Sequence, residues 1–427
     1  MRLERGRRPL SELLFSRQIE ALPPRERDFL HELVLGSLRH RGAIDRALDR
    51  ALDQPLDRLD VSVAASLRLG AHQLLHLRVP ARAAVHQSVE LSRERRSRSA
   101  ALVNAVLRRL AREGPQAPPD ARADPLAWLT TEGSLPRWLA ERWLATLGSE
   151  RAVARALALK RNPDTVFRLN PRRPEALERA RDAGLDPEPL AVPEAFRARG
   201  GRPGPLAREG LLYLQDLGSQ MAARLAARPG RVLDACAAPG GKALLLADAA
   251  PAGSTIVAAE PVRQRMATLA ELVTRWGARG VRLVRGDAAR PPFAARFDSI
   301  LLDAPCSGLG MLARRPDIRW RAQPEEIVRH AERQRIFLES LSPLVAASGT
   351  LVYAVCSLEP EETEAVMHAF LETHPDFEPA PLPEWCKPFC AGPFAQMSPE
   401  RHGGDGFFAA PLRRRSGLGS AGRLPSC

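Results

Sequence analysis

The chain has 427 residues, a formal net charge of +13 and an apolar fraction of 44%. Because this length exceeds what one hydrophobic core usually organises, we expect two or three domains. No unbroken apolar run approaches the roughly twenty residues of a membrane span, and no apolar stretch follows the charged residues at the N-terminus. The composition therefore argues against a membrane or secreted protein, and we expect a cytoplasmic location.

The excess of positive charge points to a polyanionic partner. Clustered cations gain affinity for phosphates by releasing counterions, which favours nucleic acid; a basic surface that only keeps the protein in solution is the alternative. Nearly all of the positive charge is arginine, since the only lysines are Lys160, Lys242 and Lys387. The six cysteines are too few for a disulfide scaffold and contain no Cys-x-x-Cys pair, so we predict no metal site.

Helical periodicity dominates residues 10–112. Apolar residues recur every three or four positions in 28–38 and in 63–75, which predicts an all-α bundle. The arginines within 93–98 and at 108–109 suit a solvated face and a nucleic-acid face equally well. Proline and small residues, which disfavour helix, follow from Gly114, so the predicted bundle domain spans residues 1–125.

A less regular segment, residues 126–210, follows the predicted bundle. A helix is expected to open at Leu135 and to run through Trp143. Residues 165–170 alternate like a short strand, and residues 174–183 have a helical pattern. These features predict a linker helix and a small α/β module.

From Gly230 the pattern changes to short buried strands, each followed by a helical span. The predicted strands lie at 231–235, 254–260, 281–287, 297–303 and 349–355. This alternation predicts an α/β, Rossmann-like domain with a mostly parallel, doubly wound sheet over residues 211–413. The polar, glycine-rich residues 414–427 are expected to form a disordered tail.

Polar or reactive residues directly follow each predicted strand, where the ligands of such sheets bind. The first strand leads into the turn Asp234–Lys242, the second ends at Glu260 and the third at Asp287. The Pro-Gly-Gly-Lys sequence of the turn allows a close approach of backbone to a ligand. It matches neither the Walker loop nor the dinucleotide-binding Gly-x-Gly-x-x-Gly.

The two acids indicate an adenosyl pocket. Glu260 lies where a carboxylate can accept both ribose hydroxyls of an adenosine, and Asp287 can accept from the adenine amino group. Such a pocket makes no demand for pyrophosphate, so S-adenosylmethionine fits better than NAD. The alternative is that both acids only cap the helices that follow them.

Two cysteines follow the remaining strands and suggest the reaction. Cys306 comes after the strand at 297–303 and Cys356 after the strand at 349–355. Because neighbouring strands are about 4.8 Å apart, the two thiols can converge on one substrate. Attack of a thiolate on C6 of a cytosine turns C5 into an enamine-like carbon that can take a methyl group from a sulfonium.

Two further side chains can assist this chemistry. Asp303 can favour the protonated pyrimidine ring, and Lys242 can lower the pKa of a thiol or hold the base. A free cysteine is often only a small core residue, which is the interpretation we favour for Cys236. The last three cysteines are expected to be structural: Cys386, Cys390 and Cys427.

At these residues the sequence resembles the Nol/Nop/Sun family of RNA 5-methylcytosine methyltransferases. The matching segments are Asp234–Lys242, Asp303–Gly310, Arg315–Trp320, Leu351–Glu362 and Asp405–Phe408. The resemblance implies that Cys356 is the nucleophile and that Cys306 assists product release. It also implies S-adenosylmethionine as the cofactor, bound by Cys236, Ala237, Ala238, Pro239, Gly240, Gly241, Lys242, Glu260, Asp287 and Asp303.

The sequence departs from the family pattern at three positions. Ala243 and Val355 replace threonines, and Thr363 replaces an asparagine. None of these changes removes a reacting atom. Val355 directly precedes Cys356, so its effect would fall on the positioning of that thiol.

Three N-terminal segments, 67–75, 79–90 and 103–110, are similar to the NusB-like RNA-binding domain. A NusB-like domain ahead of this catalytic domain is the arrangement of the bacterial RsmB (Sun/Fmu) type of methyltransferase. The resemblance therefore implies RNA, and specifically 16S rRNA, as the substrate, and we expect a monomer. Two alternatives remain: another RNA such as tRNA as the substrate, or an RNA-binding or termination factor whose methyltransferase domain is inactive.

Overall fold

The computed structural model of the chain describes residues 10–14, 16–95, 99–115 and 117–416. They form two compact units, the first of described residues up to Asn162 with Leu312–Arg321, and the second of Pro163–Met311 with described residues from Ala322 onward. The division falls inside the predicted middle segment, and the predicted boundaries at 125 and 210 remain predictions. Arginine-run residues 96–98 and tail residues 417–427 lie outside the described residues.

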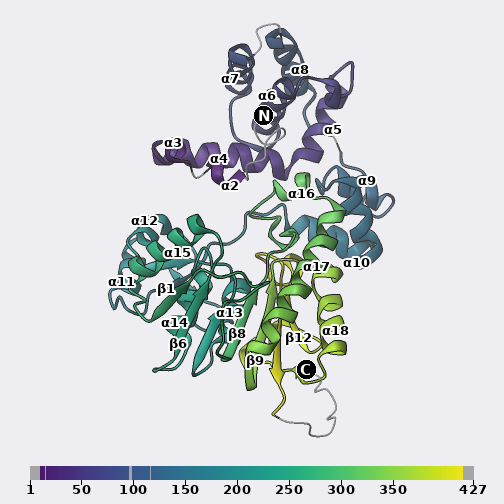
Figure 1. Ribbon diagram of the computed structural model, residues 1–427. Coiled ribbons are helices and arrows are strands. Elements are labelled where there is room, and N and C mark those ends of the chain that lie inside the picture. Colours follow the sequence, from purple (N-terminus) through teal and green to yellow (C-terminus); the bar gives the residue numbers. More distant parts are fainter. Residues whose placement is uncertain (1–9, 15, 96–98, 116, 417–427) are drawn as a thin grey trace. The chain divides into compact units, whose positions relative to one another are not determined.

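The first unit is helical, which confirms the predicted all-α bundle (Figure 1). Its elements are α2 (Leu10–Leu14), α3 (Arg17–Glu20), α4 (Pro24–Arg39), α5 (Arg41–Ala51), the 3-10 helix η1 (Leu56–Arg58), α6 (Val61–His76), α7 (Ala81–Arg95), α8 (Ala100–Glu113), α9 (Pro125–Thr130), α10 (Arg137–Ala158) and α16 (Ile318–Arg321).

Helix α8 shows why this sequence folds as a bundle. Val103, Leu107 and Leu110 recur at helical spacing and are almost fully buried, and they share one core with Leu67 of α6. Gly114 ends the helix with a positive φ of 71°, a conformation that favours glycine. The proline-rich segment predicted as a linker therefore begins where α8 ends.

Residues 312–321 belong to the first unit although they are distant from it in sequence. The buried Arg319 guanidinium donates to the carbonyl of Ser134 at 3.2 Å. Trp320 donates its indole N–H to the carbonyl of Leu38 at 2.8 Å, and Arg39 donates to the carbonyl of Ala313 at 3.2 Å. The predicted motif Arg315–Trp320 thus contributes to the packing of the helical unit.

The second unit contains a small antiparallel sheet at its N-terminal side, with strand order β2-β3-β1-β4. Its core contains Phe167, Ala180 and Leu206, all buried. The strand predicted at 165–170 and the helix predicted at 174–183 lie in this region, and the bounds of the predicted module remain a prediction. The elements are β1 (Val166–Leu169), α11 (Ala176–Asp182), β2 (Pro187–Pro189), β3 (Phe196–Ala198), α12 (Pro203–Arg208) and β4 (Leu212–Leu214).

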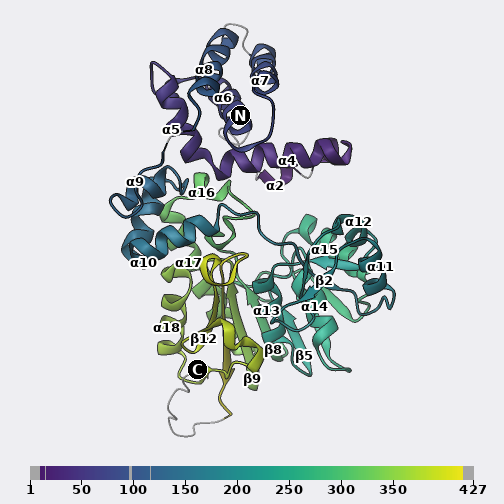
Figure 2. The ribbon, with the colours of Figure 1, turned by 180° about the vertical axis from the view of Figure 1, so that it is seen from behind.

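The main sheet of the second unit has the order β11-β12-β13-β9-β8-β5-β6-β7, with β10 paired to β13. The five strands β9, β8, β5, β6 and β7 are parallel, and β13 joins β9 in the antiparallel sense. Figure 2 shows β5, β8 and β9 side by side. The predicted mostly parallel, Rossmann-like sheet is confirmed, and the antiparallel C-terminal strands are an addition that the sequence pattern did not indicate.

The predicted strands at 231–235, 254–260 and 297–303 agree closely with the structure, whereas the predicted strand at 281–287 ends earlier than expected, at Val284, and that at 349–355 begins earlier, at Val345. The strands are β5 (Arg231–Asp234), β6 (Thr255–Ala259), β7 (Val281–Val284), β8 (Phe297–Asp303), β9 (Val345–Val355), β10 (Phe377–Pro379), β11 (Cys390–Ala391), β12 (Phe394–Met397) and β13 (Phe407–Arg414). The helices are α13 (Leu217–Ala226), α14 (Gly241–Ala249), α15 (Arg263–Trp276), η3 (Leu309–Met311), α17 (Pro324–Leu341), η4 (Ser342–Leu344), η5 (Pro360–Glu362), α18 (Glu364–Thr373), η6 (Glu384–Phe389) and α19 (Pro399–His402).

Alternate residues of the central strands enter two separate cores, because side chains alternate across a strand. Val232 and Val352 pack with α13, α14 and α15 on one face. Leu233 and Tyr353 pack with α17 and α18 on the other face. Burial on both faces explains why these strands appear in the sequence as continuous apolar runs.

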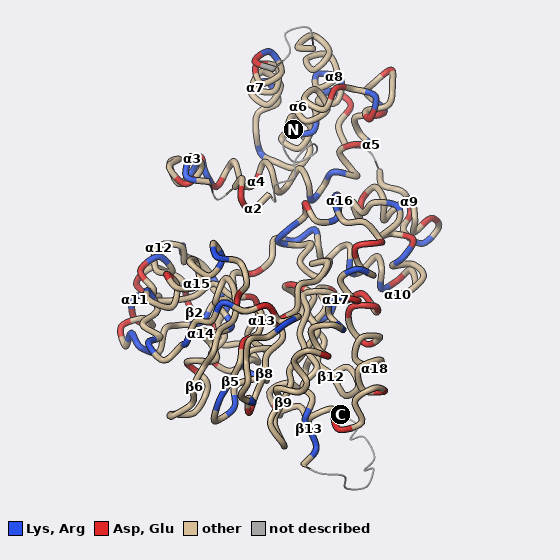
Figure 3. The backbone as a smooth tube through the Cα atoms, in the orientation of Figure 1, with Lys and Arg blue, Asp and Glu red and all other residues tan. Residues whose placement is uncertain are grey.

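Charge is distributed over both units. Figure 3 shows Lys and Arg interspersed with Asp and Glu along the described backbone of each unit, with no single block that carries the excess. Among the described residues, no helix combines the length and the apolar character that a membrane span requires.

Candidate active site

The carboxyl ends of the parallel strands bring the predicted site residues to one edge of the sheet. Asp234 at the end of β5 is paired in register with Leu301 of β8, and Asp303 at the end of β8 with Ala354 of β9. Cys356 directly follows β9. The sheet order β9-β8-β5 therefore aligns the thiols, Asp303 and the glycine turn along one line.

The turn between β5 and α14 is held by the neighbouring strands. The N–H of Ala235 donates to the carbonyl of Leu301, and that of Ala237 to the carbonyl of Ala259, both at 2.9 Å. Gly240 has a φ of 123°, and a Cβ on Gly241 would lie 2.4 Å from the ring of Tyr213. Both positions require glycine, one for its backbone conformation and one for the close packing of the ring.

A cavity of about 220 Å³ lies at this turn. Its walls include seven of the predicted site residues: Cys236, Ala237, Ala238, Pro239, Gly241, Lys242 and Asp303. They also include residues of β4, of the loop after it and of α13 that the sequence analysis missed: Tyr213, Leu214, Gln215, Asp216 and Ser219. No spacing rule indicates these five, because they reach the cavity through the packing of Tyr213 and of α13 against α14.

The two predicted adenosine-binding acids lie at their expected strand ends but do not line this cavity. Glu260 is buried, accepts from the N–H of Val262 at 3.0 Å and lies 3.6 Å from the guanidinium of Arg265. Asp287 is exposed and accepts from the N–H of Ala289 at 3.0 Å. Neither acid caps a helix in the way that the alternative expected, because the N-cap of α15 is Val262 and the described residues between Asp287 and β8 form no helix. The role of both acids in cofactor binding remains a prediction.

Asp234 is a buried carboxyl group without a hydrogen-bond partner. Its side chain is fully buried, and neither oxygen accepts a hydrogen bond from a described residue. Burial raises the pKa of Asp234 to about 7, against the opposing charge of Lys242. Asp234 does not line the cavity, so its charge acts on the site through Lys242, which does.

Lys242 and Asp303 form an ion pair inside the cavity. The Nζ of Lys242 lies 2.6 Å from Oδ2 of Asp303. Burial lowers the pKa of Lys242, but the charge and hydrogen bond of Asp303 more than offset this effect, so the net shift is upward. Lys242 therefore stays charged, and it also lies 5.8 Å from the centre of the Phe407 ring.

The sulfur atoms of Cys306 and Cys356 lie 3.2 Å apart, although fifty positions separate the residues in sequence. Each thiol is partly exposed. The third cysteine of the region, Cys236, lines the cavity, and burial followed by the charge of Asp234 raises its pKa well above the usual range. Cys236 is thus a neutral thiol, which agrees with the structural role favoured for it from the sequence.

The predicted motif Asp405–Phe408 supports the loop that carries Cys306. The N–H of Gly406 donates to the carbonyl of Gly310 at 2.7 Å, and the N–H of Gly310 donates to the carbonyl of Cys356 at 3.0 Å. A Cβ on Gly310 would lie 2.1 Å from the carbonyl oxygen of Gly406. Two backbones in direct contact therefore join the segments that carry both thiols.

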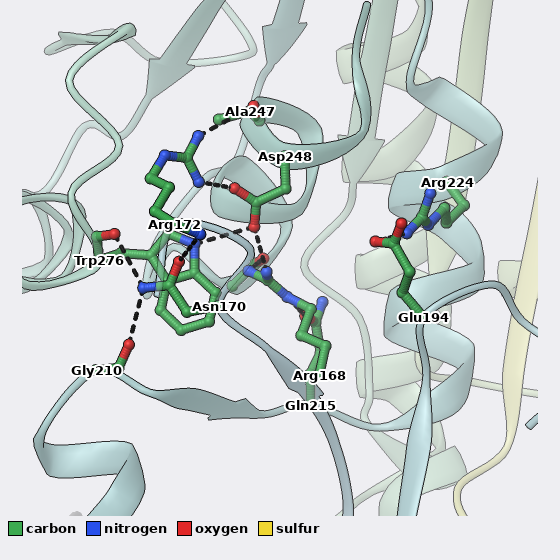
Figure 4. A network of polar contacts seen from close by, with 11 residues as sticks. Arg168, Asn170, Arg172, Glu194, Gly210, Gln215, Arg224, Ala247, Asp248 and Trp276 are labelled. Carbon is green, nitrogen blue, oxygen red and sulfur yellow. Dashed lines mark hydrogen bonds and ion pairs between the residues drawn. The ribbon is translucent and has the colours of Figure 1, made fainter. Parts of the chain in front are cut away.

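A buried ion-pair network holds the glycine turn from the side of the small sheet. Figure 4 shows Arg168, Arg172 and Trp276 around the carboxylate of Asp248 on α14. Arg168, which is almost fully buried, also donates to the side chain of Gln215 at 3.1 Å and to the carbonyl of Gly241 at 3.3 Å. Arg168 therefore links a wall of the cavity to the first residue of α14.

Comparisons with known proteins agree with the two units. The family described as "16S rRNA methyltransferase RsmB/F" matches residues 223–413, and the NusB family matches residues 4–112. The chain is 34% identical over 426 residues to "Probable ribosomal RNA small subunit methyltransferase B" of Bacillus subtilis, covering 95% of each chain. It is 35% identical over 431 residues to "Ribosomal RNA small subunit methyltransferase B" of Thermus thermophilus, covering 97% of this chain and 95% of the relative.

The structural comparison gives the same result. The crystal structure of the protein PH0851 matches with a TM-score of 0.79 and 25% identity, covering 95% of this chain and 96% of that one. The fold and the site together define a methyltransferase with a Rossmann-like catalytic domain and a NusB-like helical domain. The chain belongs to the ribosomal RNA small subunit methyltransferase B family, which confirms the family resemblance stated from the sequence.

Proposed function

We propose that the chain transfers a methyl group from S-adenosylmethionine to C5 of a cytosine in 16S rRNA, through a covalent bond between Cys356 and C6 of the base. The proposal goes beyond the family assignment in the position of the methyl group and in the roles of the side chains. The relatives in Bacillus subtilis and Thermus thermophilus are named as small-subunit rRNA methyltransferases, which supports this class of RNA.

The observation that carries the proposal is the pair of thiols at the sheet edge. Cys306 and Cys356 lie 3.2 Å apart, and Lys242, which lines the cavity with Asp303, contacts Asp303 at 2.6 Å. A methyltransferase that acts on an oxygen or an exocyclic nitrogen has no need of a thiol. C5 of cytosine is a poor nucleophile until a thiolate adds to C6, so the thiol pair favours this position.

The residues around the glycine turn fit S-adenosylmethionine. The cofactor, when bound, supplies a methyl group on a positively charged sulfonium. The turn contributes the small residues Ala237, Ala238 and Gly241 to the cavity wall, which allows a ligand to approach its backbone closely. The cavity walls carry no cluster of cations for a pyrophosphate, since Lys242 is already paired with Asp303.

Cys356 and Cys306 have separate roles in the proposed reaction. The Cys356 thiolate adds its electron pair to C6, and the C5–C6 π electrons form the new bond from C5 to the methyl carbon. The bond from that carbon to the sulfonium sulfur breaks, and its electron pair stays on that sulfur. C5 then loses its proton to water, the C6–S bond breaks, and its electron pair returns to the Cys356 sulfur. Cys306 lies beside the sulfur that leaves, which suits the assisting role in product release.

The base is held by the ion pair across the cavity. The carboxylate of Asp303 can hydrogen-bond to the N3 and N4 edge of a cytosine and favour the protonated ring, which makes C6 more electrophilic. Lys242 fixes Asp303 in place through the 2.6 Å contact. A base inside a duplex would have to leave the stack at a cost of a few kcal/mol, so we expect a cytosine in a loop or at a helix end.

The helical unit offers a surface for RNA. A hollow of about 1200 Å³ lies between α7 and α8, and its walls combine the small side chains of Ala81 and Ala101 with the cations Arg82, Arg93 and Arg108. Cations around a groove with small side chains suit a phosphate backbone. This observation favours the nucleic-acid interpretation of the arginines over the solvated-face alternative.

The test is methyl transfer from labelled S-adenosylmethionine to protein-free small-subunit rRNA. We expect the wild type to form 5-methylcytosine and Cys356→Ala to form none. Cys306→Ala should accumulate a protein–RNA adduct that survives denaturing electrophoresis, because release of the C6–S bond is impaired. Cys390→Ala, which changes a cysteine on β11 outside the site, is the control and should behave as the wild type.

Each alternative gives a different outcome in this test. Methylation of tRNA but not of rRNA would favour another RNA as the substrate. Tight binding of rRNA without methyl transfer to any RNA would favour a non-catalytic binding factor. Full activity of Cys356→Ala would refute the assigned nucleophile.

A further inference from the structure

Glu362 is a fully buried carboxylate next to the thiols that the proposed reaction leaves unused. It is the last residue of η5, and its side chain has no exposed surface. Its oxygens accept from the N–H of Ser307 at 2.8 Å, from the hydroxyl of Ser307 at 2.5 Å and from the amide of Gln334 at 3.2 Å. These three hydrogen bonds hold both oxygens of the carboxylate in one orientation.

The network around Glu362 forms hydrogen bonds with both residues that flank Cys306 in the sequence. Ser307 is bound directly to the carboxylate, and the amide of Gln334 also donates to the carbonyl of Pro305 at 3.1 Å. Tyr353 on β9 donates its hydroxyl to Oε1 of Gln334 at 2.9 Å and to the carbonyl of Glu362 at 2.6 Å. The position of the Cys306 sulfur is therefore set by groups from η5, α17 and β9.

The charges around the two sulfurs are opposite in sign. The side chains that face Cys306 include Cys356, Glu362 and Tyr353, none of which is a cation, and the backbone N–H of Gly308 donates to its sulfur. Among the described residues, no Lys or Arg forms an ion pair with Glu362. The hydrogen bond to Cys356, burial and the charge of Glu362 raise the pKa of Cys306. Lys242, by contrast, faces Cys356.

We propose that Glu362 is a positioning residue that keeps Cys306 a neutral thiol and directs its S–H at the sulfur of Cys356. The single proton of the thiol pair then resides on Cys306, and the negative charge resides on Cys356, the sulfur that attacks C6. When the C6–S bond later breaks, its electron pair returns to Cys356 and the S–H of Cys306 stabilises the leaving thiolate. This inference rests on the proposed function for its catalytic consequence, but the protonation of the thiols can be measured without it.

The experiment measures alkylation of the two thiols by iodoacetamide as a function of pH, at low conversion and under reducing conditions, with the modified peptides quantified by mass spectrometry. In the wild type we expect Cys356 to react with a lower pH midpoint than Cys306. In Glu362→Gln, the midpoint of Cys306 should fall by about one unit or more, and that of Cys356 should rise because the proton is now shared. Glu364→Gln, which changes an exposed carboxylate two residues away, should leave both midpoints unchanged.

Methyl transfer gives an independent measurement. We expect Glu362→Gln to lower kcat about tenfold, the equivalent of one pKa unit, with little change in KM and with the pH–rate profile moved to higher pH. If Glu362→Gln does not fold, as judged by circular dichroism, Glu362→Asp is the second variant. It keeps the charge but moves it away from Cys306, and we expect a smaller shift of the Cys306 midpoint in the same direction. Equal midpoints in the wild type, or unshifted midpoints in a folded variant, would overturn the proposal. Absence of methyl transfer in the wild type would instead refute the proposed function.

Discussion

At the scale of single residues, Asp234 lies in surroundings that disfavour a charged carboxylate. Its carboxyl group is fully buried without a hydrogen-bond partner, and burial raises its pKa from 3.8 to about 7. Because the folded state holds the proton more tightly than the unfolded state, the stability associated with this group is greatest below pH 3.8 and is lost as the pH rises to about 7. Asp234 thus costs stability at neutral pH, as groups at functional sites often do.

We therefore predict that Asp234→Asn raises the free energy of unfolding at pH 8 by about 3 kcal/mol while it weakens the binding of S-adenosylmethionine. The gain should shrink towards pH 4, where the wild-type carboxyl is protonated in the folded state. Urea unfolding at several pH values and calorimetric titration of the cofactor test both effects. Asp182→Asn on the exposed face of α11 is the control, and an unchanged stability of Asp234→Asn at pH 8 would contradict the argument.

At the scale of elements, the clamp between β1 and α14 connects stability with the site. Asp248 on α14 is paired with Arg168 and Arg172, and the Asp248 and Arg168 side chains are 2% and 4% exposed. Burial lowers the pKa of Arg168, and the charge of Asp248 offsets part of this effect. Removing the carboxylate would leave a buried guanidinium without a counter-charge.

We predict that Asp248→Ala lowers the free energy of unfolding by about 3–5 kcal/mol, the usual effect of breaking a buried pair. It should also weaken cofactor binding, because Arg168 holds the carbonyl of Gly241. Glu209→Ala breaks the Arg179–Glu209 pair, whose side chains are 48% and 46% exposed, and should cost less than about 1 kcal/mol. Equal losses in the two variants, measured by chemical denaturation, would show that the buried Asp248 pair contributes no more to the free energy of unfolding than the exposed pair does.

At the scale of the whole molecule, the two units are expected to respond differently to acid. In the first unit, His40 and His76 stack with ring centres 4.1 Å apart, next to the buried His72. Burial and neighbouring positive charge lower the pKa of His40 to about 2 and that of His72 to about 4, and lower that of His76. A lowered histidine pKa means stability that is complete above the unfolded value near 6.5 and is lost as the pH falls below it.

We predict that acidification from pH 7 to 5 reduces the protection of α4 and α6 against hydrogen exchange, after correction for the intrinsic rate, but does not reduce that of β5 and β8, where protonation of Asp234 favours the folded state. His72→Phe keeps a ring in the stack without the unpaired nitrogens and should flatten this pH dependence. The exposed His86→Phe should not. Equal protection of α6 at both pH values would refute the prediction.

Local patterns in the sequence were sufficient to predict many of the strands and several site residues of the second unit. The strands at 231–235, 254–260 and 297–303 were predicted nearly to the residue, because strands buried on both faces form continuous apolar runs. The glycine turn and the two thiols could be predicted because strand ends in a parallel sheet meet at one edge. The 3.2 Å separation of Cys306 and Cys356 agrees with that expectation of convergence.

The sequence by itself thus determined the helical and Rossmann-like units and the family, and it indicated the pair of thiols at the sheet edge, since periodicity and short motifs are properties of neighbouring residues. Only the tertiary structure decided that Tyr213 and Gln215 line the cavity, that residues 312–321 pack in the helical unit, and that Glu362 faces Cys306. These contacts join segments far apart in the chain. They depend on which surfaces pack together, and the charge that each thiol experiences is therefore a property of the folded molecule.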